Sequence, residues 1–300
     1  MTGITPNIAV CICTYKRPRL LARTLENLQR QEKDGRFSYS IVVADNDASQ
    51  SARSAVSEFA AKASIPIKYC VEPQQNIALA RNRALENAEG EYVAFIDDDE
   101  FPTKRWLVRL FDACTNYEVD GALGPVVPEF ESRPPQWVVK GGFFERPNYE
   151  TGYKLGWKQT RTGNVLFRRT ILEGSEIWFS PEFDTGGEDV DFFRRMTEQG
   201  RSFVWCREAV VYEVVPSSRC KRGYLLKRAL LRGSNFPKHP KDQWLNIAKS
   251  LIALPLYTLI LPVLALFGQH VFVKYLIKCC DHASRLLAFL GVNLVAQREM

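Results

Sequence analysis

The first hundred residues alternate short apolar runs, rich in β-branched residues, with amphipathic helical stretches. The strand-like runs cover residues 8–13, 40–44, 67–71 and 92–96. Between the first two, Leu21, Leu25 and Leu28 recur at helical spacing, and Asn76 can cap a second helix. This alternation is typical of an α/β fold in which a largely parallel sheet carries helices on its faces. We therefore predict such a sheet for this half of the chain.

Polar residues cluster where these strands end, at residues 14–17, 45–47 and 97–99. In open α/β sheets, ligands bind outside the carboxyl ends of the strands. The sequence therefore predicts one binding site that these strand ends share.

An acidic turn follows the apolar strand 92–96, because Asp97, Asp98, Asp99 and Glu100 stand side by side. Crowded carboxylates need a counter-charge, and Mg²⁺ or Mn²⁺ would bridge one or two of them to substrate phosphates. The alternative is a solvated turn that only caps the next helix. The turn alone leaves both interpretations open.

Three other charged positions each have a functional and a structural interpretation. Asp45 or Asp47 could accept hydrogen bonds from a base or ribose, or could form an Asx turn or helix cap before Ser49. Arg81 could face a phosphate or be an exposed helix charge. Each of these signals is weak when taken separately.

A predicted helix begins within the sequence GGEDVDFFRR, which places Glu188 and Asp189 near its N-terminus. The helix dipole stabilises negative charge there, which is a sufficient structural explanation. The functional alternative is that a carboxylate pointing into the site takes a proton from an attacking hydroxyl.

Several function classes lack their usual sequence support. No GxGxxG follows the first strand, and neither a GxxxxGK[ST] loop nor a Gly-x-Ser-x-Gly elbow occurs. The net charge of +6 is too balanced to indicate a nucleic-acid partner. The eight cysteines lack zinc-site spacing, so we expect them to be reduced and mostly buried.

Residues 128–158 are rich in Pro, Gly and aromatic side chains, and we expect a long loop there. The aromatic part, from Trp137 to Trp157, could close over the substrates, or could simply pack into a core. After it we predict a strand at 163–168, a helix at 188–199 and one or two strands within 202–214.

The C-terminal region begins near residue 216 with clustered Arg and Lys, and residues 250–273 contain no Asp, Glu, Lys or Arg. That stretch is long enough to cross a bilayer, although Pro255 and Pro262 would bend it, and the stretch after it is amphipathic. We favour a membrane-bound helical hairpin; the alternative is packing on the catalytic domain or in a dimer. We expect a catalytic domain at 1–215, with a nucleotide-binding half (1–100) and an acceptor half (101–215), and a membrane-associated region at 216–300.

The segments CTYKRP, VADND, NIALARN, FIDDDE and GGEDVDFFRR, in this order, resemble the family 2 glycosyltransferases of the inverting GT-A type. The resemblance covers about residues 7–235. Within the family the chain is most similar to bacterial exopolysaccharide glucosyltransferases that extend lipid-linked repeat units in succinoglycan-type pathways. It implies a GT-A fold, a Rossmann-like mixed sheet flanked by helices.

The resemblance also implies roles for particular residues. Thr14 and Asp45 would contact the nucleobase. Arg81 would lie on the diphosphate side, Asp98 at the ribose and Asp99 at the metal, with Asp97 supporting the turn. Asp189 would be the catalytic base, with Glu188 orienting the acceptor or a loop. Many relatives have a histidine after the last core strand, where this chain has Tyr212 and Glu213, so a further metal contact is in doubt.

These residues together predict a metal-dependent inverting glycosyltransferase. We expect Mg²⁺ or Mn²⁺, a nucleotide-sugar donor, specifically a UDP-sugar, and a glycan or lipid-linked acceptor in polysaccharide biosynthesis. The N-terminal residues lack the pattern of an export signal, so we expect the enzyme on the cytoplasmic side of the inner membrane. The alternatives are a non-catalytic nucleotide-sugar-binding subunit, against which Asp189 argues, and a nucleotidyltransferase, which would want a glycine in CTYKRP.

Overall fold

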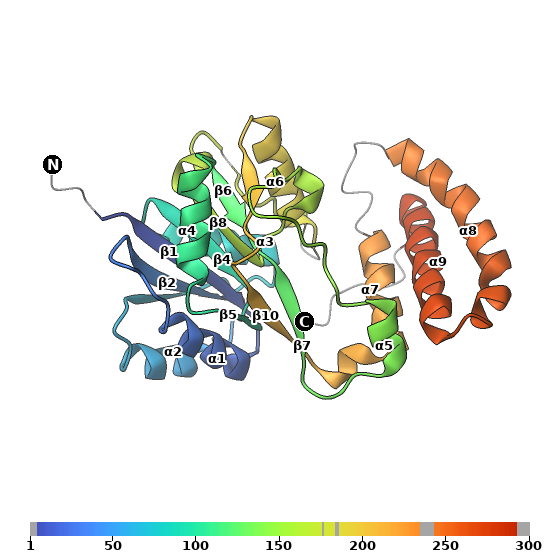
Figure 1. Cartoon of the computed structure of the whole chain (residues 1–300), viewed down its shortest axis with the longest axis horizontal. Helices are drawn as coiled ribbons and strands as arrows, with labels where there is room; N and C mark the ends of the chain where they lie inside the picture. Colours follow the sequence, from blue (N-terminus) through green and yellow to red (C-terminus); the bar gives the residue numbers. More distant parts are fainter. Residues whose placement is uncertain (1–4, 176, 184–185, 235–242, 293–300) are drawn as a thin grey trace. The chain divides into compact units, whose positions relative to one another are not determined.

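The computed structural model describes residues 5–175, 177–183, 186–234 and 243–292 (Figure 1). Its central sheet has the strand order β3-β2-β1-β4-β8-β6-β9. The first four strands in sequence are β1 (Asn7–Thr14), β2 (Ser38–Asp45), β3 (Ile67–Val71) and β4 (Tyr92–Ile96). They pair in parallel, so their carboxyl ends meet at one edge of the sheet, as predicted.

Three later strands extend this sheet beyond β4: β8 (Asn164–Arg168), β6 (Gly121–Leu123) and β9 (Phe203–Trp205). Strand β8 runs antiparallel to both β4 and β6, whereas β9 is parallel to β6. The sheet is therefore mixed and mostly parallel, which confirms the predicted fold class.

Helices cover both faces of the sheet: α1 (Pro18–Leu28), α2 (Arg53–Ala60), α3 (Ile77–Asn87), α4 (Trp106–Asn116) and α6 (Glu188–Glu198). The side chains of β1 alternate between the two layers. Ile8, Val10 and Ile12 pack with the apolar faces of α1, α2 and α4, while Ala9 and Cys11 pack with those of α3 and α6. This alternation is the period of two expected for a strand buried on both faces.

A second sheet has the order β5-β10-β7 and contains β5 (Glu100–Pro102), β7 (Val126–Phe130) and β10 (Val211–Val215). Strand β10 is antiparallel to β5, whose first residue, Glu100, is also the last residue of the acidic turn. The strand region expected at 202–214 is thus two strands, β9 and β10, which belong to different sheets.

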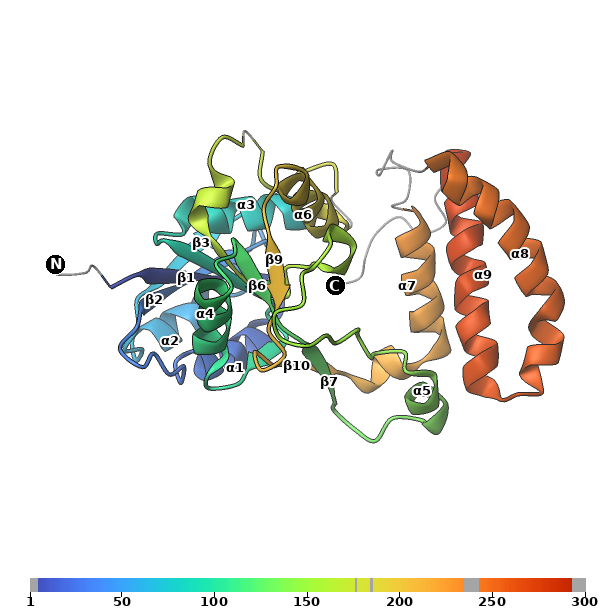
Figure 2. The same ribbon diagram turned by 45° about the horizontal axis from the view of Figure 1, so that its top comes forward.

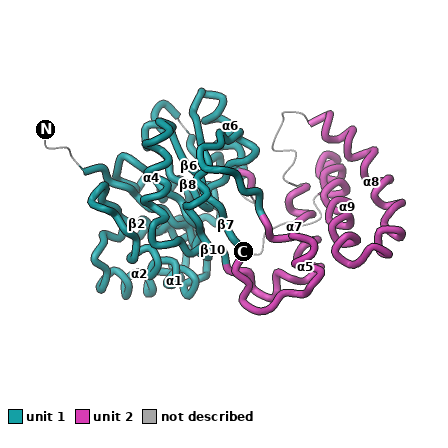
Figure 3. The backbone as a smooth tube through the Cα atoms, viewed as in Figure 1, with its two compact units in different colours: residues 1–127, 146–184, 188–213 teal, residues 128–145, 185–187, 214–300 magenta. Residues whose placement is uncertain are grey.

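The described chain divides into two compact units (Figure 3). Unit 1 draws on residues 1–127, 146–184 and 188–213, and unit 2 on residues 128–145, 185–187 and 214–300. The sequence predicts a single boundary after 215, whereas the contacts also assign 128–145 to unit 2.

The expected long loop contains regular structure, namely part of β7, the helix α5 (Gln136–Gly141) and a 3₁₀ turn (Trp157–Gln159). Its aromatic residues divide between the units. In unit 2, Trp137 and Phe143 pack against a small core that contains Val138. In unit 1, Tyr149 and Tyr153 stack with ring centroids 4.6 Å apart. These side chains have packing partners, and closure over the substrates stays a prediction.

Unit 2 ends in three helices: α7 (Arg222–Ser234), α8 (Gln243–Ala265) and α9 (Gln269–Phe289). Helix α9 packs against both of the others, and the three lie side by side in Figures 1 and 2. Helix α8 stays helical through Pro255 and Pro262. Among the described residues it is the one helix long and apolar enough, by length and composition, to cross a membrane.

All eight cysteines are described, and none forms a disulfide. Five are buried and three are half-buried, in agreement with the expectation of reduced, mostly buried thiols.

Candidate active site

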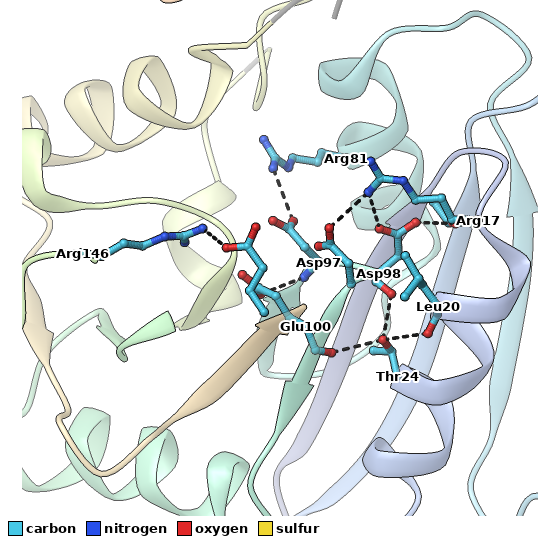
Figure 4. Close-up of polar contacts among 11 residues, drawn as sticks. Arg17, Leu20, Thr24, Arg81, Asp97, Asp98, Glu100 and Arg146 are labelled. Atoms are coloured by element: carbon cyan, nitrogen blue, oxygen red, sulfur yellow. Dashed lines mark hydrogen bonds and ion pairs between the residues drawn. The ribbon is translucent and has the colours of Figure 1, made fainter. Parts of the chain in front are cut away.

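The acidic turn is held in place from the side of helix α1. The Thr24 hydroxyl lies 2.9 Å from the backbone carbonyl oxygen of Asp98 and 3.1 Å from that of Glu100, so its proton can be shared between the two carbonyls (Figure 4). Within the turn, the backbone N–H of Asp97 donates to Oε2 of Glu100 at 3.1 Å. The turn therefore has a defined backbone, which a freely solvated acidic loop would lack.

Two side chains from the end of β1 and the residues after it contact the acidic turn. The Thr14 hydroxyl donates to Oδ2 of Asp98 at 2.7 Å. Nη1 of Arg17 lies 3.3 Å from Oδ1 of Asp98 and 3.3 Å from Oδ2 of Asp99. The strand-end argument covered residues 14–17 but did not single out Arg17, whose charge next to a predicted anionic cluster was an available signal.

Arg81 joins the acidic turn to helix α6. Its helix, α3, begins where the Asn76 side chain accepts hydrogen bonds from the backbone N–H groups of residues 78 and 79, as predicted. From there the buried guanidinium reaches Oδ1 of Asp97, at 3.9 Å, and forms an ion pair with Glu188. The alternative of an exposed helix charge is therefore wrong for Arg81.

Asp189 lies in the first turn of α6, next to Glu188. Its Oδ1 accepts the Val190 backbone N–H at 2.8 Å, and the side chain is half-buried. Burial opposes the charge of Arg81, but the negative charges of Glu188, Asp97 and, to a smaller extent, Asp189 together raise its pKa. Asp189 thus lies within electrostatic range of the same arginine that contacts the acidic turn.

A third arginine, Arg146, lies near the acidic turn through its partner Glu213. Strand pairing places Glu213 directly across from Glu100, and Arg146 forms an ion pair with Glu213 (Figure 4). Tyr212 pairs instead with Phe101, and its side chain is exposed. Of the two residues at the position where many relatives have a histidine, Glu213 is therefore the one beside the acidic turn. Neither motif nor periodicity marks Arg146, because it stands in the irregular middle of the chain.

The acidic turn contains more buried negative charge than its arginines neutralise. Burial raises the pKa of Asp98 to about 7, and the charge of Asp99 adds to this, while Arg17 and the Thr14 hydroxyl oppose it. Burial also raises the pKa of Glu100 well above its usual range. Such a site favours either protonation or an added cation.

Asp45 is fully buried at the end of β2, directly beside Thr14 in the parallel register. Its Oδ2 accepts the Tyr69 hydroxyl and the Ala52 backbone N–H, both at 2.8 Å. Its Oδ1 has no hydrogen-bond partner among the described residues. Asp47, by contrast, accepts hydrogen bonds from the backbone and hydroxyl of Ser49, which is the structural alternative that the sequence offered.

The predicted site residues therefore fall into one connected group and one neighbour. One set of contacts joins Thr14, Asp98 and Asp99 through Arg17, and another joins Asp97 and Glu188 through Arg81. The two sets meet in the acidic turn, where Asp97 and Asp98 are adjacent in the chain. Asp189 adjoins this group through the chain, and Asp45 is the neighbour at the next strand end.

Comparison with known proteins gives a consistent family and fold. The family model "Glycosyl transferase family 2" matches residues 9–173. The succinoglycan biosynthesis protein ExoM of Rhizobium meliloti (strain 1021) is 35% identical over 241 residues, which is 78% of this chain and 75% of that protein.

Two solved structures share the fold over 95% of this chain. The mannosyltransferase PcManGT from Pyrobaculum calidifontis, in complex with GDP-Man and Mn²⁺, has a TM-score of 0.59 at 20% identity, with 88% of that chain covered. TarS 1–349 of S. aureus, in complex with UDP-GlcNAc, has a TM-score of 0.55 at 16% identity, with 91% covered. Both structures support the predicted GT-A fold. Because the family model matches residues 9–173 and ExoM is 35% identical over most of the chain, this chain belongs to glycosyltransferase family 2 and is a glycosyltransferase.

Proposed function

We propose that the protein transfers a sugar from a nucleotide sugar to an acceptor hydroxyl by a single inverting displacement, with Asp189 as the base. The observation that carries this proposal is the bridge that Arg81 makes between Asp97 of the acidic turn and Glu188 of helix α6. This bridge supports a donor site that lies next to the candidate base within unit 1.

Thr14, Asp45 and Asp98 would bind the nucleoside part of the donor. A buried oxygen without a partner is costly, and Oδ1 of Asp45 is such an atom among the described residues. An N–H group of a nucleobase, such as the imide N–H of uracil, would donate a hydrogen bond to this oxygen. We propose a UDP-sugar on this basis, and the complex of TarS with UDP-GlcNAc is consistent with it.

The acidic turn fits a divalent cation. Burial raises the pKa values of Asp98 and Glu100, and one oxygen of the buried Glu100 has no partner among the described residues. No group of three ready ligands is present in the described parts of the chain, so diphosphate oxygens and water would complete the coordination. Asp99 would hold the ion, with Asp97 supporting the turn. A bound Mg²⁺ or Mn²⁺ would neutralise charge that develops on the departing diphosphate.

The residues of the chain would divide the remaining work. Arg81, freed in part from Asp97, would turn toward the diphosphate, and Arg17 would do the same from the other side. Asp189 would take the proton from the attacking hydroxyl: its Oδ1 accepts the Val190 backbone N–H, and among the described residues no hydrogen bond to its second oxygen is found. Glu188, paired with Arg81, would position the first turn of α6.

We propose a glycan on a lipid carrier as the acceptor, in the synthesis of a bacterial polysaccharide. The similarity to ExoM, which is a succinoglycan biosynthesis protein, supports this choice. The apolar helix α8 supports a location at the membrane, and we propose the cytoplasmic face of the inner membrane, where nucleotide sugars are made.

Purified protein tested against a panel of nucleotide sugars, with and without Mn²⁺, would test this function. We expect release of UDP from one UDP-sugar, stimulated by Mn²⁺, and inversion at the anomeric carbon of the product. Turnover that is unchanged by a chelator would refute the metal role, and turnover with a GDP-sugar alone would refute the proposed nucleobase.

A further inference from the structure

Helix α8 has one narrow side that faces α9. Its less exposed positions include a series at spacings of three and four residues, namely Ile247, Ser250, Leu254, Tyr257, Leu261 and Leu264. This is the narrow seam of two packed helices. Near the start of the seam Trp244 lies against Phe289, with ring centroids 5.3 Å apart, and further along it Tyr257 lies against Tyr275, at 5.4 Å.

The rest of the α8 surface is apolar and exposed. From residue 250 to 273 the chain has no Asp, Glu, Lys or Arg. Trp244 and Leu245 are exposed in the first turn of α8, and the exposed large side chains from residue 251 onward are Leu251, Ile252, Leu256, Leu259, Ile260, Val263, Leu266 and Phe267. Only 11% of the most apolar window of α8 is buried. A helix that is apolar over most of its circumference needs an apolar medium around it, because packing against one neighbouring helix covers only one side.

The charge of this region identifies lipid as that medium. Residues 214–292 contain twelve Lys and Arg residues but only two acidic residues. Two copies of so basic a region would repel each other, whereas a bilayer with anionic headgroups attracts it. The surface of α8 therefore fits an anionic membrane better than it fits a second copy.

The charged residues of the neighbouring helix α9 argue against α8 crossing the bilayer as a transmembrane helix. Nζ of Lys278 lies 5.4 Å from the centre of the Tyr257 ring and 4.6 Å from that of Tyr275. Tyr257 stands near the middle of the uncharged stretch of α8. If α8 crossed the bilayer, α9 would cross beside it, and Lys278 would lie near the bilayer centre, where a charge is costly. Lys274, which is exposed, would lie in hydrocarbon as well.

We propose that the α8–α9 hairpin lies along the membrane interface instead of crossing it. The outer face of α8, marked by Leu259, sits among the acyl chains near the headgroups. Helix α9 lies on the aqueous side, so that Lys278 and the tyrosines beside it are at headgroup level, the depth that such side chains prefer. This inference rests on the proposed membrane role and specifies its geometry.

Binding is tested first with the full chain and vesicles of phosphatidylcholine and phosphatidylglycerol. We expect the protein to float with vesicles that contain phosphatidylglycerol, and Leu259→Glu to reduce the bound fraction at least tenfold. The matched control is Ser57→Glu, which adds the same charge at an exposed position of α2 and should float normally. Full-length protein that ignores these vesicles and elutes as a dimer would overturn the proposal in favour of a second copy.

The depth of the hairpin in the membrane is tested with an environment-sensitive fluorophore attached to a cysteine introduced at position 259, 267 or 274. The unsubstituted protein, labelled in the same way, gives the background. In Leu259→Cys we expect stronger quenching by a shallow spin-labelled lipid than by a deep one, and in Lys274→Cys little quenching by either. A span would be indicated if Phe267→Cys, on vesicles, reacted with an impermeant thiol reagent only after the vesicles were permeabilised. That result would overturn the interfacial geometry but would leave sugar transfer, measured in parallel, unaffected.

Discussion

The guanidinium of Arg81 forms a buried ion pair with the carboxylate of Glu188, although the two residues are 107 positions apart in the chain. The pair joins helix α3 of the nucleotide-binding half to helix α6, which carries the candidate base. In the sequence alone, each partner is one of several charged residues on its amphipathic helix, and nothing marks the two as a pair.

Removing one partner of this pair should destabilise the fold. In Arg81→Met the buried Glu188 loses its counter-charge, and we expect the free energy of unfolding to fall by about 3–5 kcal/mol. The double variant Arg81→Met with Glu188→Leu should recover much of this loss, since an apolar pair replaces the ion pair. Urea unfolding of all three proteins measures both effects. Equal stability of Arg81→Met and the unsubstituted protein would contradict the buried pair.

Asp99→Asn should nearly abolish sugar transfer while the protein remains folded. It replaces the anionic ligand with a weaker neutral one, and we expect a loss of about 100-fold or more in kcat/KM at saturating Mn²⁺. Circular dichroism and thermal unfolding provide the check on folding. Near-normal turnover at saturating Mn²⁺ would remove Asp99 from the metal role.

Asp189→Asn should remove the chemical step and spare donor binding. The variant keeps an oxygen that can accept the Val190 backbone N–H but loses the proton acceptor, so we expect kcat to fall by roughly 10²–10⁴. Calorimetric titration with the nucleotide sugar and Mn²⁺ should give a Kd within about threefold of the original. A parallel collapse of donor affinity would instead assign Asp189 to the donor site.

The stability of the protein without nucleotide should depend on pH through Asp98. Its pKa is raised from 3.8 to about 7 in the folded state, so its contribution to stability is present below pH 3.8 and is lost as the pH rises through about 7. A shift of this size corresponds to at most about 4 kcal/mol. In Asp98→Asn this loss should disappear, so the variant should gain stability relative to the unsubstituted protein between pH 4 and pH 8.

Comparing the two proteins at each pH removes the contributions of other titrating groups. A difference between them that stays constant from pH 4 to pH 8 would show that Asp98 ionises normally. Asp98→Asn should also lose sugar transfer, because the ribose contact and the charge of the acidic turn are both altered.

Local patterns in the sequence were sufficient to predict the order and type of most elements. The strands β1 to β4 were predicted within two residues at either end, because their apolar runs are bounded by polar turn residues. The Asn76 cap was predicted from the residue type alone, since the capping hydrogen bonds are local. The meeting of Thr14, Asp45 and Asp98 followed from parallel pairing, which brings carboxyl ends to one edge.

The tertiary structure alone decided which charges pair across long separations. Arg146 and Glu213 meet because the chain passes from β9 of the central sheet to β10, which pairs with β5 in the second sheet. No periodicity in the sequence encodes that change of sheet. Residues 128–145 belong to unit 2 because Trp137 and Phe143 find their apolar partners there. Periodicity shows which face of an element is apolar, but the packing of distant elements selects the partner that buries it, and only that packing reveals Arg81 beside Glu188.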